Sequence, residues 1–146
     1  MASMTAALRD RLKANAGVKA IASTRVYRDE RPQGSALPAI VILLVSDPRD
    51  YTYAGRTDFR RSRVTVECLA SSRGAADELA EVVITACEGA AVVGATAFQR
   101  AILANQFGDS DRVTDGTIFR TAVDLFVWHS TPDGTPGLAN TTTQGD

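Results

Sequence analysis

Two apolar segments joined by a long polar loop dominate the middle of this sequence and restrict the folds that it can adopt. The first, residues 39–45, contains no polar residue and follows Pro38, at a position where a strand tolerates the missing N–H. The second, residues 61–69, alternates between polar and apolar side chains. The two patterns predict antiparallel strands, the first covered on both faces and the second on one.

The connection between these strands, residues 46–58, is longer than a hairpin turn requires and contains Tyr51 and Tyr53. Tyrosines on a projecting arm are well suited to contact another protein, since they bury a large area with little loss of rotamer freedom. A position in the core for one of them is an equal alternative. We therefore expect a long projecting β-hairpin, with Tyr51 and Tyr53 as candidate subunit-contact residues.

Arginines are concentrated at the end of this loop and on the return strand. The simpler interpretation is a solvated strand face on which they pair with Glu67 or with neighbouring acids. The alternative is a surface that contacts another subunit or nucleic acid, because the guanidinium group fits carboxylates and phosphates. The candidate subunit-contact residues in this group are Arg56, Arg60, Arg61 and Arg63.

The remaining pattern predicts an α+β fold. Helical periodicity is strongest over residues 71–88, a second helix is expected near residues 5–15, and a helical turn over 18–22. Further strands are expected over 25–28, 96–107 and 117–128, with an acidic, glycine-bounded loop over 108–116. We predict an antiparallel sheet of four or five strands with two helices packed on one face.

The chain of 146 residues has the length of one domain, and we assign residues 1–129 to it. Residues 130–146 contain one large apolar side chain, Leu138, and cannot offset the entropy of ordering by themselves. The sequence therefore predicts an extended C-terminal tail, for which a neighbouring subunit is the simplest binding partner.

Residues that could carry chemistry are few. His129 is the single histidine, and neither a metal-ligand spacing nor a Gly-x-Ser-x-Gly motif accompanies it, so we expect it to pack at a strand end. Asp109, Asp111 and Asp115 lack the glycine and glutamate of a calcium loop. Cys68 and Cys87 are expected to be buried free thiols. The sequence predicts no enzyme, no metal and no cofactor.

Charge and hydropathy exclude two further classes of protein. The formal net charge of −1 gives no reason to expect a dedicated nucleic-acid-binding protein. The longest apolar run has about seven residues, far fewer than the ~20 that cross a bilayer, and the first residues lack the apolar core of a signal peptide. We expect a protein that is made in the cytoplasm and does not enter a membrane.

Several segments, in this order and spacing, resemble the tail completion (tail terminator) proteins of long-tailed bacteriophages. The likeness covers about residues 4 to 129 and includes the small-residue helix with Ala76, Leu79 and Ala80. The segments that carry it most clearly are Arg31–Gly34 before Leu37-Pro38, Asp47–Tyr51, Arg63–Cys68 and the final strand Phe119–His129. Such proteins also occur in prophages and in gene transfer particles.

The resemblance implies a structural virion protein at the junction of tail and neck. Such a protein forms a ring, typically of six subunits, that caps the tail tube, ends its polymerisation and joins it to the head connector. Its partners would be further copies of itself, the tail tube protein and a head-tail connector or head-closure protein. DNA would pass through the lumen without specific binding, and we place the acidic Asp109 and Asp111 there.

Two other interpretations remain open. A head-closure or connector-adaptor protein of the neck would show the same lack of chemistry and differ only in its position. A small α+β ligand-binding domain or enzyme belongs to another class, and the lone histidine argues against it.

Overall fold

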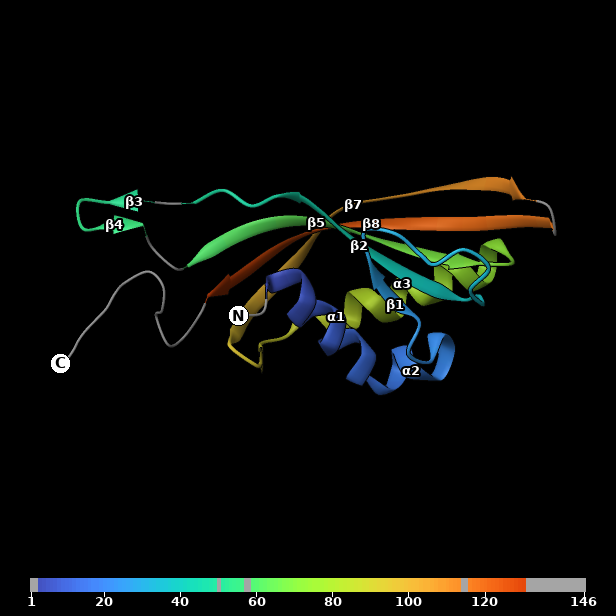
Figure 1. Cartoon of the computed structure of the whole chain (residues 1–146), viewed down its shortest axis with the longest axis horizontal. Helices are drawn as coiled ribbons and strands as arrows, with labels where there is room; N and C mark the ends of the chain where they lie inside the picture. The colour runs from blue at the N-terminus through green and yellow to red at the C-terminus, as the bar shows by residue number, and fades with distance from the viewer. Residues whose placement is uncertain (1–2, 50, 57–58, 114–115, 131–146) are drawn as a thin grey trace.

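The structure is a computed structural model that describes residues 3–49, 51–56, 59–113 and 116–130. Within these ranges it contains three helices and eight strands, and Figure 1 shows the helices gathered on one face of the sheet. The helices are α1 (Met4–Ala14), α2 (Ala16–Ala22) and α3 (Arg73–Glu88). The strands are β1 (Val26–Arg28), β2 (Ala39–Ser46), β3 (Tyr51–Thr52), β4 (Gly55–Arg56), β5 (Arg60–Ala70), β6 (Ala91–Val93), β7 (Thr96–Val113) and β8 (Gly116–Ser130).

Six strands form one sheet in the order β1-β2-β5-β8-β7-β6, and β3 and β4 form a separate two-stranded hairpin. All pairs in the large sheet are antiparallel except β1 with β2, which is parallel. The α+β class and the helices on one face agree with the prediction. The predicted numbers of strands and helices differ from the structure, since the sheet has six strands rather than four or five, and α2 is a third helix.

Side-chain caps fix the starts of the helices. The Ser72 hydroxyl accepts a hydrogen bond from the Ala75 N–H at the start of α3, and Ser3 does the same for Ala6 at the start of α1. Asn15 separates α1 from α2, and its side chain accepts from the Val18 N–H. The chain therefore turns sharply between α1, which lies against the sheet, and α2, which packs against α1 and α3.

The core lies between the sheet and the three helices. On α3 the apolar stripe buries Leu79, Ala80 and Val83, as the helical period predicts. The facing strands contribute Val64 and Leu125, both fully buried. Strand β5 alternates as predicted, with one side in this core and the other on the open face of the sheet.

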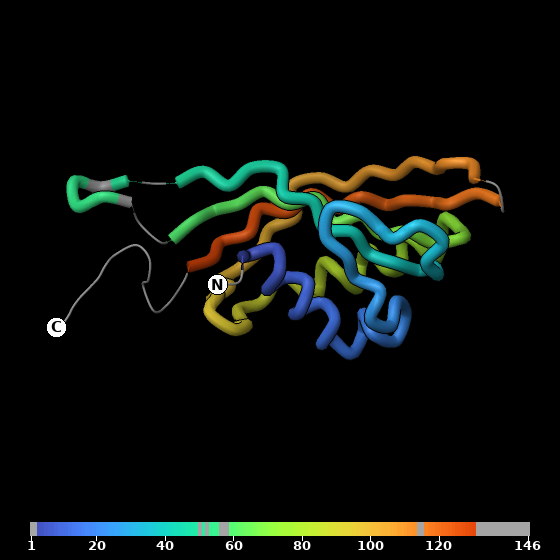
Figure 2. Tube along the Cα trace, viewed as in Figure 1, coloured from blue at the N-terminus to red at the C-terminus, as the bar shows by residue number. Residues whose placement is uncertain are grey.

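Two predictions about strands are corrected by the structure. Residues 108–113 belong to β7 rather than to a loop, so β7 and β8 are paired from Ala97 to Val113 and run toward the end of the molecule opposite the β3–β4 hairpin (Figure 2). Strand β2 is covered on both faces only as far as Ile42. Beyond it Leu44 and Val45 are exposed, and the pairing of β1 with β2 also ends at Ile42.

The predicted tail, residues 130–146, lies outside the described residues except for Ser130, which ends β8. None of the helices in the described segments has the length and hydropathy to span a bilayer.

Candidate functional site

The β3–β4 hairpin extends away from the end of β2 and β5 (Figure 1). Its strands pair Tyr51 with Arg56 and Thr52 with Gly55, which adopts a positive φ of 119°. Tyr51 is 69% exposed and Tyr53 is fully exposed, so neither belongs to the core. Both tyrosines therefore lie on a projecting arm, whereas the side chain of Arg56 lies outside the part of the chain that the structure describes.

Asp47 anchors the base of this arm. Its carboxylate lies 2.9 Å from Arg49 Nη1 and 3.2 Å from Arg60 Nη1, and it accepts a hydrogen bond of 2.7 Å from the Ser62 hydroxyl. Partial burial raises the pKa of Asp47, but the Ser62 hydrogen bond and the charges of Arg60 and Arg49 outweigh it, so the pKa is lowered. Arg60 thus holds the arm to the sheet of its own chain.

Ser62 joins Asp47 to His129. The Ser62 Oγ lies 2.7 Å from His129 Nε2, and both residues are buried. Because an ionised carboxylate can only accept, the hydroxyl donates to Asp47 and accepts from the Nε2–H of a neutral imidazole. Burial and then the charge of Arg60 lower the pKa of His129 to about 4, which keeps the ring neutral.

This order of groups differs from that of a catalytic triad. A triad places the histidine between serine and aspartate, so that the imidazole takes the serine proton. Here the serine lies in the middle and donates its proton to Asp47, a weak base because its pKa is lowered, while the imidazole does not accept that proton. The Asp47–Ser62–His129 chain is therefore a structural network that joins the arm to the last strand.

The open face of the sheet carries the predicted Arg61 and Arg63. Their guanidinium groups lie 5.0 and 5.9 Å from the centre of the Phe126 ring. Arg63 also donates to Asp124 at 3.0 Å, and the Thr65 hydroxyl donates to the same carboxylate at 2.6 Å. The acids that pair with the arginines of this strand are therefore the neighbouring Asp124 and Asp47, whereas Glu67 lies 3.8 Å from Arg120.

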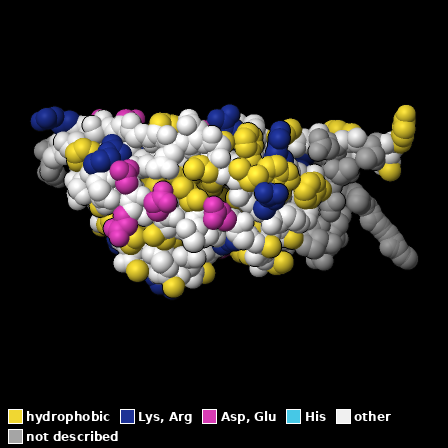
Figure 3. All heavy atoms as spheres, turned by 180° about the vertical axis from the view of Figure 1, so that it is seen from behind, with side chains coloured by type: hydrophobic (Ala, Val, Ile, Leu, Met, Phe, Trp, Pro, Cys, Tyr) yellow, Lys and Arg dark blue, Asp and Glu magenta, His cyan; other side chains and the backbone are white. Residues whose placement is uncertain are grey.

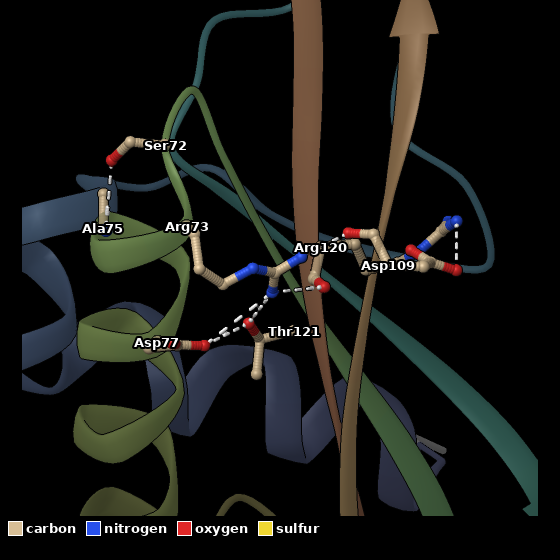
Figure 4. A network of polar contacts seen from close by, with 7 residues as sticks. All are labelled: Ser72, Arg73, Ala75, Asp77, Asp109, Arg120 and Thr121. Carbon is tan, nitrogen blue, oxygen red and sulfur yellow. Dashed lines mark hydrogen bonds and ion pairs between the residues drawn. The ribbon is translucent and has the colours of Figure 1, made fainter.

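A second polar network connects α3 to the β7–β8 pair (Figure 4). Arg73 donates to the Thr121 hydroxyl at 2.8 Å, to the Arg120 carbonyl at 3.0 Å and to the Asp109 carbonyl at 2.6 Å. The Thr121 hydroxyl donates in turn to Asp77 at 2.7 Å. These contacts tie β7 to the helix layer at the point where a loop was expected.

Gly108 allows this close approach. A Cβ atom built there would lie 2.5 Å from Arg73 Nη1 and 3.2 Å from the Arg120 carbonyl oxygen. A side chain at this position would displace the end of Arg73 and crowd the Arg120 carbonyl, so glycine here serves packing, whereas the sequence alone indicates a loop boundary.

The predicted lumen residues Asp109 and Asp111 both lie exposed on β7. Asp109 accepts two hydrogen bonds from Arg120, at 2.7 and 3.1 Å, and these lower its pKa. Register places Asp109 opposite Arg120 and Asp111 opposite Ile118, so the two carboxylates share the open face of the sheet with Phe126.

The described residues offer little for catalysis or metal binding. They contain no group of three His, Cys, Asp or Glu side chains that could hold a metal ion. A groove of about 620 Å³ lies between residues 31–37 and the far end of the β7–β8 pair. Arg31 is the one ionisable side chain among its described lining residues, and it is bonded to Ser35. The groove thus lacks converging acid and base groups.

The two thiols are inert. Cys68 and Cys87 are both free and buried, as predicted. Burial raises the pKa of the Cys68 thiol far above its usual range and that of Cys87 to about 12.

Comparison with known proteins agrees with the resemblance found in the sequence. The family model described as "Tail completion protein gp17" matches residues 6–130. Among solved structures, a chain from "Virion of native gene transfer agent (GTA) particle" is similar in fold, with a TM-score of 0.60 and 21% sequence identity over 88% of this chain and 95% of that one. A search of curated proteins gave no match.

The family match spans both networks, the projecting arm and the whole sheet, and this family consists of structural tail proteins of virions rather than enzymes. On this match the chain belongs to the tail completion protein gp17 family.

Proposed function

We propose that this protein forms a ring that caps the phage tail tube, ends its polymerisation and joins it to the head connector. The ring has six subunits, as is typical of the tail terminators that the sequence resembles. The single observation that supports this most is the family match over residues 6–130. The similarity of fold to a chain of a gene transfer agent virion is consistent with a role in particles of that kind.

The shape of the chain suits such a ring. A stable contact buries about 800 Å² on each partner, and a ring subunit needs two different contact patches besides the faces that meet tube and connector. The projecting hairpin with Tyr51 and Tyr53 provides area beyond the compact body. Arg61 and Arg63 on the open face remain accessible beside Phe126 and are further candidates for subunit contacts.

Asp109 and Asp111 are proposed to face the lumen. Carboxylates on the wall of a channel repel the phosphate backbone, so DNA can pass without the counterion release that drives non-specific binding. Arg120 pairs with Asp109 and offsets its charge, so we expect Asp111 to contribute more of this repulsion.

Electron micrographs of particles made without this protein test the proposal. We expect overlong tails that are not joined to heads, and expect the wild-type gene supplied in trans to restore joined tails of uniform length. Unjoined tails of normal length would instead favour a head-closure or connector-adaptor protein. Normal joined particles would contradict both.

A further inference from the structure

The large sheet has an open edge on each side. Strand β6 pairs with β7 only over Thr96–Phe98, and the Asp109 carbonyl is occupied by Arg73. Between these points, residues 99–107 of β7 have no strand partner on their outer side among the described residues. On the opposite side, β1 ends at Arg28, so Leu43–Ser46 of β2 is open in the same way. Natural proteins usually cover or blunt such edges, because they pair with other chains.

Both open edges carry exposed apolar side chains. On β7 Ile102 is 39% and Leu103 is 41% exposed, and on β2 Leu44 is 48% and Val45 is 53% exposed. Figure 3 views the molecule from behind and shows hydrophobic side chains gathered midway along it. Two uncovered strand edges, each with an apolar pair, are suited to strand addition.

The two apolar pairs lie at the same level of the sheet. Register connects Leu103 to Leu125, Leu125 to Val64, and Val64 to Leu44. Paired residues of antiparallel strands point to the same face, so Leu103 and Leu44 both point to the helix side. They lie on opposite edges, about 14 Å apart across three strand spacings.

We infer that neighbouring copies of this chain join edge to edge, with residues 99–107 of β7 in one copy pairing with Leu43–Ser46 of β2 in the next. The inference rests on the proposed ring and identifies its subunit contact. Strands β2 and β7 run in opposite directions in one sheet. A rotation about an axis parallel to the strands keeps these directions, so β7 of one copy meets β2 of the next as an antiparallel pair.

The level register removes the rise between copies that would give an open helix. A contact between two different edges is heterologous and produces either a ring or an open helix. Because Leu44 and Leu103 lie at one level, their pairing needs no shift along the strand direction, and successive copies stay in one plane. Such a contact closes when the rotation between copies divides a full turn.

The charges of the two sides favour this pairing over β7 with β7. Helix α3 lies under β5, β8 and β7 and carries four exposed acids, whereas Arg9 and Lys13 of α1 lie beside β1 at the opposite edge. Figure 3 shows the acidic side chains beside the hydrophobic group. Residues 3–31 carry seven basic and three acidic side chains, and of the basic ones Arg11 lies on the α3 side, where it donates to the Gly89 carbonyl. The acids on α3 are Asp77, Glu78, Glu81 and Glu88, which would meet the basic side of the next copy.

A cysteine pair tests the contact. In the double variant Leu44→Cys/Leu103→Cys the two positions are too far apart to bond within one copy, since a disulfide needs Cα atoms about 4.4–6.8 Å apart. Opposite residues of an antiparallel pair meet this requirement. Cys68 and Cys87 do not interfere, because both are buried. After mild oxidation we expect a ladder of covalent multimers on a non-reducing gel, ending at the number of subunits in the ring.

Matched controls separate the outcomes. Leu44→Cys/Val113→Cys moves the second thiol about 34 Å along the strand to a residue of similar exposure, 40%, and should give no ladder. Single variants should give none either, and dimers from Leu103→Cys alone would indicate β7 with β7 and overturn the inference. A ring in native mass spectra without a ladder would overturn this contact and leave the ring intact. Neither ring nor ladder would overturn both.

Discussion

Replacing Tyr51 and Tyr53 together with alanine is expected to weaken self-assembly or binding to the tail tube by on the order of 100-fold or more, with little change in thermal stability. Both side chains lie on the projecting hairpin, and Tyr51 is already 69% exposed in the single copy, so their removal leaves no cavity in the core. Buried aromatic anchors at interfaces contribute about 2 kcal/mol or more each. Sedimentation of the variant, alone and with tube protein, measures the loss.

The double variant Tyr51→Phe/Tyr53→Phe is the matched control, since it keeps the apolar area and loses only the hydroxyls. It should retain most of the assembly. A large fall in the melting temperature of the alanine variant would contradict the assignment, because it would show that the tyrosines stabilise the fold of the isolated chain.

Lowering the pH from 7 to 5 is expected to reduce the free energy of unfolding by about 2 kcal/mol. The pKa of His129 is lowered from 6.5 to about 4 in the folded chain. Between these values the unfolded chain binds a proton that the folded chain does not, so stability is present above pH 6.5 and is lost as pH falls toward 4. His129 is the single histidine, and unfolded Asp and Glu titrate nearer pH 4. Urea unfolding at fixed protein concentration measures the change.

The variant His129→Gln controls for this effect. Glutamine keeps an N–H donor for Ser62 but does not titrate, so the difference in stability between pH 7 and 5 should fall below about 0.5 kcal/mol. An equal pH dependence in the variant and in the wild type would show that other groups cause the loss. The lowered pKa of Asp47 keeps its contribution in place above pH 4.

The elements with a complete local pattern were predictable from the sequence. Helix α3 follows from its apolar stripe and from Ser72 before it, and β5 follows from alternation alone. The end of β7 could not be predicted, because Gly108 and the acids after it are typical of a turn. Arg73 and Arg120 override that preference, and their positions depend on the packing of α3 and on the pairing of β7 with β8.

The site was predictable only in part for a similar reason. Tyr51 and Tyr53 could be named because an overlong loop with aromatic residues is a local signal. Ser62 was missed, although a polar residue in phase with Val64 on the buried side of β5 is a usable sign. The partnership of Arg63 with Asp124 depends on strand order, which pairs β5 with β8 rather than only with β2.

The open edges show the same limit. Leu44 and Leu103 are ordinary strand residues in the sequence, and nothing local distinguishes them from core positions. Only the order of the six strands places both at an edge and at one level.

The central claim is that the chain works as a closed ring, and the mass of the purified protein in native conditions tests it most directly. The subunit mass is 15.5 kDa, and six copies give roughly 93 kDa. We predict a discrete species of about this mass, or an equilibrium between it and the monomer that shifts to the ring when tube protein is added. A single species of 15.5 kDa, both alone and with tube protein, would contradict the account.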